Sequence, residues 1–152
     1  VIVLLGILAV TAAPKFLNLQ DDARDATLEG MRGSLETAAS VVNGKALIQN
    51  VSGTSDAPAT VNVGNSVTVT AVNGYPQAIA ANVTKLIDFD FTRGNAEFGV
   101  TEVGDDVLIY ATGFDGYADD APDAADAPCT VRYVNSTAEG VRPVITVNTC
   151  VQ

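Results

Sequence analysis

The feature that most constrains this chain is its first thirteen residues, VIVLLGILAVTAA, which carry no charge. As an α-helix this run would be about 20 Å long, whereas the hydrocarbon core of a bilayer is about 30 Å thick. The run is therefore too short to cross a membrane. Because the chain begins at Val1 rather than at Met, we expect the run to be the remaining part of a membrane segment. A secretory signal is the alternative, but no small-residue cleavage site separates the run from the chain that follows.

After Pro14 the pattern changes to that of a long amphipathic helix over residues 15–50. Apolar residues recur at steps of three, four or five, with charged residues between them. The predicted apolar stripe consists of Phe16, Leu19, Ala23, Ala26, Met31, Leu35, Ala38, Val42 and Ala46. Glu29, Arg32 and Glu36 have the spacing of neighbours on a helix surface, which predicts two ion pairs on the outer face.

The remaining residues, 51–152, are predicted to form a β-rich head. Alternation of Val with Thr or Asn before residue 72 is typical of one strand, or of two strands joined at Gly64-Asn65, and NGYP is typical of a tight turn. A short helix is predicted over residues 77–86. Further strands are predicted at residues 96–103, 106–112, 129–134 and 144–150, of which the last two form a hairpin.

The composition excludes several classes of function. The 152 residues include 8 Lys and Arg against 18 Asp and Glu, a net charge of −10, so the chain lacks the positive charge that nucleic-acid binding requires. The absence of His excludes an imidazole base and His-ligated zinc or haem. No catalytic constellation is visible in the sequence. We therefore expect no enzyme activity, no cofactor and no nucleic-acid partner.

Two cysteines, Cys129 and Cys150, lie near the C-terminus. Redox and zinc motifs use closer spacing or further ligands, whereas a separated pair in a small acidic protein is typical of a structural disulfide formed in an oxidising compartment. Two free buried thiols are the alternative. A disulfide would join the ends of the last predicted hairpin.

Acidic residues are concentrated between residues 115 and 126, and no Lys or Arg occurs from residue 94 to residue 131. Carboxylates on a flexible loop can bind a hard cation such as Ca²⁺, but this spacing does not match an EF-hand loop. A solvated acidic loop is therefore favoured. The weaker candidates for cation ligands are Asp115, Asp119, Asp120 and Asp123.

A second acidic motif is the alternation of Asp88 and Asp90 with Phe89 and Phe91. Two nearby carboxylates could serve acid–base chemistry. The same alternation is typical of an edge strand with one polar face, and we favour the strand.

The segment VIVLLGILAVTAAPKFLNLQDDAR resembles the N-terminal region of type IV pilins. In that family an apolar stretch with a glycine like Gly6 runs to a proline like Pro14, and an aromatic residue and a long amphipathic helix follow. The pair Cys129 and Cys150 is similar to the disulfide that closes the C-terminal region of these proteins. PKFLNLQDDARDATLEGMRGS, with NGYP after a strand, is most similar to the mannose-sensitive haemagglutinin subgroup.

The resemblance implies an α+β pilin fold, in which a long N-terminal helix packs on an antiparallel β-sheet head. The helix would occupy residues 1–50, with a truncated transmembrane and filament-core segment at 1–14 and an amphipathic part at 15–50. The head would occupy residues 51–152, with its disulfide region at 129–150. The filament-core positions implied are Val1, Ile2, Val3, Leu4, Leu5, Gly6, Ile7, Leu8, Pro14 and Phe16.

The chain departs from the family at its start. Family members are cut after a glycine by a prepilin peptidase, which leaves an N-methylated aromatic residue and, shortly after it, a glutamate that neutralises a neighbour's terminus. Neither of these two residues is present in the apolar run that begins this sequence. We expect about eight positions to precede Val1, which would lengthen the uncharged run to about 21 residues, enough for a transmembrane helix.

The implied function is that of a major structural subunit, which polymerises into a type IV pilus for adhesion or surface attachment and for motility. Its partners would be identical subunits, the inner membrane before assembly, the assembly machinery and a host or abiotic surface. The pilus would be extracellular, on a Gram-negative bacterium with an inner-membrane pool of subunits. The alternative is the major pseudopilin of a type II secretion system, but those proteins usually lack a terminal disulfide and rely on calcium. Gly6 and Pro14 would mark a segment that loses helical hydrogen bonds in the filament.

Overall fold

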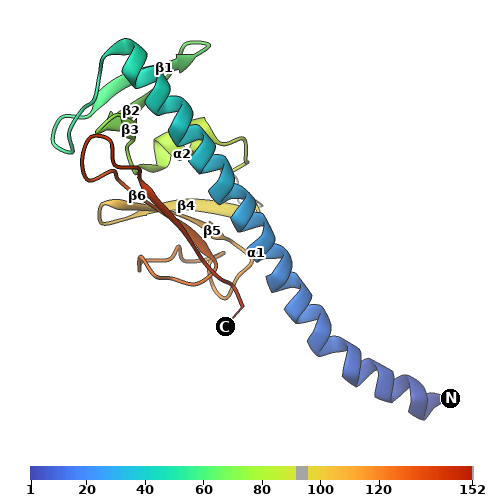
Figure 1. The fold of residues 1–152 in the computed structure, drawn as a ribbon. Coiled ribbons are helices and arrows are strands. Elements are labelled where there is room, and N and C mark those ends of the chain that lie inside the picture. The colour runs from blue at the N-terminus through green and yellow to red at the C-terminus, as the bar shows by residue number, and fades with distance from the viewer. Residues whose placement is uncertain (92–95, 152) are drawn as a thin grey trace.

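The computed structural model describes residues 1–91 and 96–151, and the side chains of residues 5 and 7–18 also lie outside the description. The fold is α+β, with one long N-terminal helix packed against antiparallel sheets (Figure 1). The helices and strands are α1 (Ile2–Gln49), β1 (Ala59–Gly64), β2 (Val67–Val72), β3 (Tyr75–Pro76), α2 (Ala80–Leu86), β4 (Phe98–Val103), β5 (Asp106–Ala111), β6 (Thr130–Val134) and β7 (Val144–Asn148).

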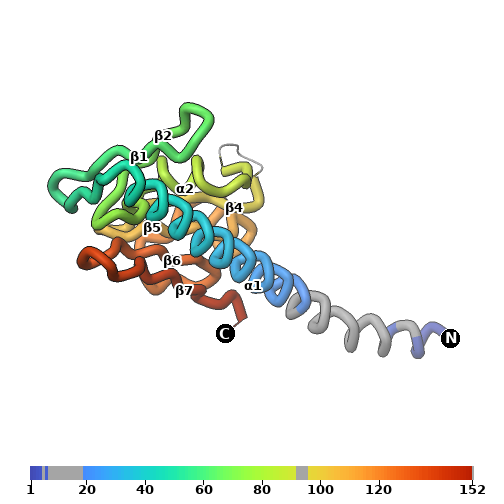
Figure 2. Tube along the Cα trace, turned by 45° about the horizontal axis from the view of Figure 1, so that its top comes forward, coloured from blue at the N-terminus to red at the C-terminus, as the bar shows by residue number. Residues whose placement is uncertain are grey.

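Helix α1 lies across the head with its C-terminal half and carries the N-terminus away from it (Figure 1 and Figure 2). It ends where Asn50 adopts a left-handed conformation with φ 54°, and the backbone N–H of Asn50 donates to the Leu47 carbonyl. A left-handed residue of this kind is a common helix terminator. Among the described residues, no helix is both long and apolar enough to cross a membrane.

One face of α1 is buried against the head. Its buried apolar side chains are Leu28, Met31, Leu35, Ala39, Val42 and Ala46. The predicted stripe was therefore correct from Met31 onward, apart from Ala38, which is half-buried beside the fully buried Ala39. It was wrong nearer the N-terminus, where Leu19 is 60 % exposed. Periodicity does not show how far the head extends along the helix, and among the described side chains of α1 the first buried one is Leu28.

Within the described residues, the head contains two sheets rather than the one that was expected, a three-stranded sheet in the order β1-β2-β3 and a four-stranded sheet in the order β4-β5-β6-β7. Helix α1 contacts β1 and β3 of the first sheet and β6 and β7 of the second. Each sheet therefore has its own apolar cluster beneath the helix. Met31 and Leu35 belong to the cluster that includes Ile109 and Val131, and Val42 belongs to the cluster that includes Val61.

The first sheet confirms the tight turn predicted at NGYP, whereas the join predicted at Gly64-Asn65 lies one residue later, at Asn65-Ser66. Strands β1 and β2 are joined at Asn65 and Ser66, which have φ of 50° and 62°, and β2 and β3 are joined at Asn73 and Gly74, with φ of 53° and 78°. Two consecutive positive φ values are typical of the tight turns that suit twisted antiparallel strands, and Asn and Gly tolerate them best. The segment before residue 72 therefore forms two strands, β1 and β2, rather than one.

Candidate functional site

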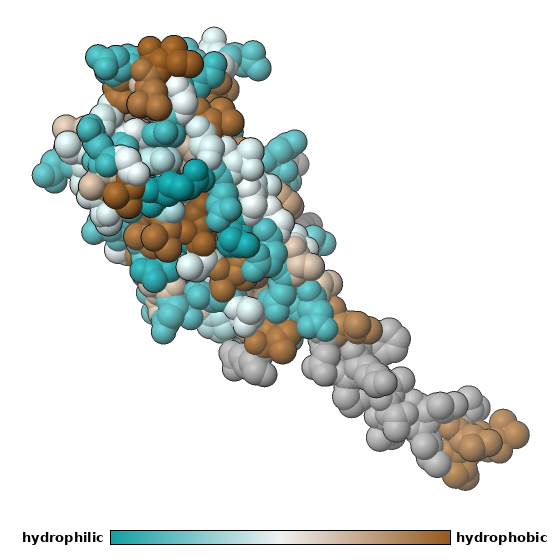
Figure 3. Space-filling model, in the orientation of Figure 1, coloured by the Kyte–Doolittle hydropathy of each residue, from teal (hydrophilic) through white to brown (hydrophobic). Residues whose placement is uncertain are grey.

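The N-terminal tip of α1 exposes a group of large apolar side chains. Val1, Ile2, Val3 and Leu4 are 95, 86, 74 and 66 % exposed, and they form the apolar end of the molecule in Figure 3. Gly6 is also exposed. The other predicted filament-core positions lie outside the described side chains, namely Leu5, Ile7, Leu8, Pro14 and Phe16. An apolar helix end in water is unfavourable, so this tip favours contact with another apolar surface.

Two adjacent residues attach α1 to the lower end of the head. An Asp25 carboxylate oxygen accepts a hydrogen bond of 2.6 Å from the backbone N–H of Cys150. Arg24 donates to the Gly113 carbonyl at 2.9 Å and pairs with Asp21 at 3.0 Å. These contacts join the helix to the end of the second sheet and to the C-terminal segment, which are far from it in sequence. They therefore define the angle at which the helix leaves the head.

Replacement of Asp25 by Ala is expected to destabilise the head by about 1.5–3 kcal/mol, because it removes a charged acceptor and leaves the N–H of Cys150 unpaired. Urea unfolding of the chain without residues 1–20, which keeps every contact named here, measures this loss. Asp22→Ala is the matched control, since Asp22 lies three residues before Asp25 on the same helix and is exposed. Equal free energies of unfolding for the two variants would contradict the attachment role of Asp25.

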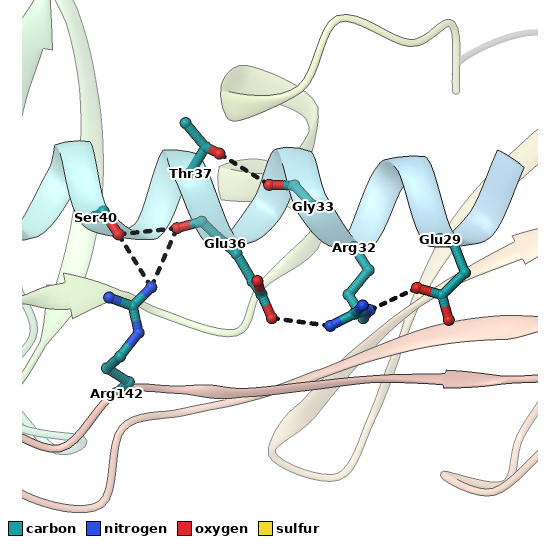
Figure 4. Close-up of polar contacts among 7 residues, drawn as sticks. All are labelled: Glu29, Arg32, Gly33, Glu36, Thr37, Ser40 and Arg142. Carbon is teal, nitrogen blue, oxygen red and sulfur yellow. Dashed lines mark hydrogen bonds and ion pairs between the residues drawn. The ribbon is translucent and has the colours of Figure 1, made fainter. Parts of the chain in front are cut away.

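Further along α1, the predicted ion pairs are confirmed. Arg32 contacts Glu29 at 2.8 Å and Glu36 at 3.1 Å, and the hydrogen bond and charge of Glu29 raise the pKa of Arg32 (Figure 4). Because these groups are substantially exposed, the pairs contribute little to stability. Arg142, from the segment between β6 and β7, contacts α1 about one turn further along and donates to the Ser40 hydroxyl at 3.0 Å. This face of α1 is therefore occupied by polar contacts within the chain.

The two cysteines form a disulfide, as predicted, and the alternative of two free thiols is wrong. Cys129 and Cys150 are 0 and 3 % exposed, and they flank the antiparallel pair β6 and β7. The backbone N–H of Cys150 also donates to Asp25, so the disulfide-bonded hairpin is connected to α1 by this hydrogen bond. The C-terminal end of the second sheet is thus held by a covalent bond and by the helix.

The acidic loop, residues 115–126, is exposed at all five of its aspartates. Within the described residues, no three or more acidic or cysteine side chains are grouped so that they could hold a metal ion. The candidate ligands Asp115, Asp119, Asp120 and Asp123 therefore do not converge, because successive turns direct them to solvent. Tyr117 in this loop donates to the Pro128 carbonyl at 3.0 Å, and burial together with the charges of Asp115 and Asp123 raises its pKa.

The motif around Asp88 and Asp90 does not form the predicted edge strand. Residues 88–91 have no strand structure, and both aspartates are exposed. The intervening aromatic rings meet instead, with the centroid of Phe89 6.2 Å from that of Phe91 and 6.1 Å from that of Phe98. Alternation was misleading here because packing between the aromatic rings, rather than pairing with a strand, determines this segment.

An open groove between α1 and α2 was not anticipated from the sequence. It has a volume of about 780 Å³ and is lined by Gly30, Gly33, Ser34, Thr37, Ala38, Val41, Val42, Val63, Lys85 and Leu86. Two lining hydroxyls are satisfied within the helix, since Ser34 donates to the Gly30 carbonyl and Thr37 to the Gly33 carbonyl. The side chains that form the floor of the groove are therefore mostly small or apolar. The recurrence of small residues along one outer face of the helix was the available signal.

The described residues thus present three exposed surfaces: an apolar helix tip, an open groove and an acidic loop. No family model, no curated protein and no solved structure matches this chain. What these surfaces contact must accordingly be argued from their own chemistry.

Proposed function

We propose that this chain is a structural subunit of the type IV pilin class that polymerises into a filament. The observation that carries the proposal is the exposed apolar tip, Val1–Leu4, on a single helix whose other half is anchored on an acidic head. Copies of the same helix can cover one another's apolar residues, and that burial is favourable at about 25 cal/mol per Å². The α+β arrangement of a long N-terminal helix on antiparallel sheets is compatible with a pilin fold.

The proposed contact is between unlike surfaces of neighbouring copies. A helix end that inserts among the helices of other subunits forms a heterologous contact, and such contacts produce open helical filaments unless the rotation closes a ring. The heads, with most of the net charge of −10, would remain outside in water. The layout therefore supports a filament with residues 1 to about 25 in its core.

The finer proposal is a pilus of the mannose-sensitive haemagglutinin subgroup, extracellular on a Gram-negative bacterium, for adhesion or surface attachment and for motility. Before assembly the subunit would be in the inner membrane, where the assembly machinery receives it, and the finished pilus would contact a host or abiotic surface. The pseudopilin of type II secretion is the second candidate. The disulfide between Cys129 and Cys150 favours the pilus over it.

Electron microscopy of purified surface filaments tests the proposal. We expect a helical homopolymer of this chain, with apolar α1 segments at the axis and heads outside. In its map, hydrogen bonding along the helix should be lost between Gly6 and Pro14. Purified filaments that lack this chain would contradict the function, whereas an unbroken helix from Val1 to Phe16 would contradict only the melted segment.

A further inference from the structure

The groove between α1 and α2 has a positively charged rim. Lys85 is the charged residue among those that line it. Lys45 follows Val41 by one helical turn on the same face of α1, and both lysines are exposed. The groove thus combines a floor of mostly small or apolar side chains with one lysine in its lining and a second one helical turn beyond Val41.

These two lysines differ in their partners from three of the arginines, although Arg142 also contacts a hydroxyl and a carbonyl rather than a carboxylate. Arg24, Arg32 and Arg132 each contact a carboxylate at 3.0 Å or less. In the described part of the chain, neither Lys45 nor Lys85 forms an ion pair, although Lys85 donates one hydrogen bond of 2.9 Å to the Thr68 carbonyl. In a chain with net charge −10, exposed lysines of this kind attract acidic groups of another molecule.

The acidic loop has the complementary chemistry. Its aspartates are exposed, and the residues between them include small apolar ones such as Ala118 and Ala124, which are exposed as well. Negative charge matches the lysines, and small apolar side chains can contact a floor in which Gly, Ser, Thr and Ala alternate with Val and Leu. The loop is therefore complementary to the groove in charge.

Within one molecule, no residue of the acidic loop lines the groove. The loop follows Gly113, which contacts Arg24, whereas Lys45 lies 21 residues further along α1, about 32 Å at 1.5 Å per residue. In Figure 1 the loop (orange) is at the lower end of the head, and the C-terminal end of α1 is at the top. The acidic loop and Lys45 are therefore at opposite ends of the part of α1 that packs on the head.

We propose that the acidic loop of one copy docks in the groove between α1 and α2 of the next copy, with Lys45 and Lys85 facing its aspartates. This inference rests on the proposed function, since it names the contact between heads in the polymer. Because the two patches differ, each copy can offer its loop to one neighbour and its groove to another, so the contact propagates. Its charge complementarity selects the register of neighbouring heads.

The other occupant that this chain could supply is the N-terminal part of α1 of a neighbour. That segment has no charge before Lys15, so it would leave the lysines at the rim without partners. The loop satisfies them, and for that reason we assign the groove to the loop.

Cross-linking of the full chain tests the contact directly. Thr37→Cys places a thiol in the groove and Ala124→Cys places one on the loop, and neither change alters a charge. With both substitutions in one chain, a short bismaleimide should produce a ladder of covalent oligomers, at a yield roughly tenfold above that of the control. The control combines Ala124→Cys with Thr137→Cys, another exposed threonine, which lies outside the groove.

Charge reversal provides the second arm. Lys45→Glu with Lys85→Glu, and separately Asp119→Lys with Asp120→Lys, should each reduce filament yield roughly tenfold, whereas a mixture of the two chains should recover it. Filaments without the ladder and without this recovery would overturn the docking contact but leave the proposed function intact. A ladder between Thr37→Cys and Val3→Cys, in place of the loop ladder, would assign the groove to the helix instead. If the full chain forms neither filaments nor a ladder, both proposals are wrong.

Discussion

Deletion of residues 1–20 is expected to abolish filament formation entirely and to leave a monomeric head, even at concentrations where the full chain is polymerised. The deletion removes the exposed apolar tip while it leaves the buried stripe of α1 from Leu28 onward. Each apolar side chain lost from the filament core forfeits about 1.5–3 kcal/mol of burial, so the loss over the tip exceeds what contacts between acidic heads can replace. Sedimentation and electron microscopy of the deleted chain measure the outcome.

Single substitutions provide a matched control for this deletion. Ile2→Asp introduces a charge at the tip, whereas Val144→Asp introduces the same charge at an exposed apolar position of the head, with exposed fractions of 86 and 56 %. We expect only Ile2→Asp to prevent assembly. Filaments formed by the deleted chain, or equal loss in the two substituted chains, would show that the helical tip does not drive polymerisation.

Removal of the disulfide is expected to cost about 3 kcal/mol of stability. The bond joins residues 21 positions apart, and closure of a loop of this size constrains the unfolded chain by about that amount in the chain-entropy model. A typical domain is stable by only about 5–15 kcal/mol, so the change is a large share of the total. Urea unfolding of the chain without residues 1–20, with and without Cys129→Ala and Cys150→Ala, measures this loss.

Reductant supplies the control for this experiment. It should destabilise the unsubstituted head by about the same 3 kcal/mol and should leave the doubly substituted head unchanged, because only the first contains the bond. The hydrogen bond from the N–H of Cys150 to Asp25 uses the backbone and survives both treatments. Two free thiols in the denatured, unreduced protein would exclude the disulfide, and the expected loss with it.

Much of the fold could be predicted from the sequence because it is encoded over short distances along the chain. The apolar period of three to four residues predicted α1, Asn73-Gly74 predicted a turn, and alternating Val residues predicted β1 and β2. The pairing of Cys129 with Cys150 was predictable for a different reason, since a chain with two cysteines allows only one intramolecular disulfide. The exposed tip likewise follows from the uncharged run that begins the chain.

Only the tertiary structure decided which residues the head covers and which it leaves open. Leu28 is buried although the periodic stripe omitted it, because burial depends on where the sheets meet the helix. Asp25 and the N–H of Cys150 are brought together across 125 residues, a distance at which no local pattern carries information. The groove beside Lys85 exists because α2 packs next to α1. Local periodicity thus determined the elements, whereas long-range packing determined the surfaces between them.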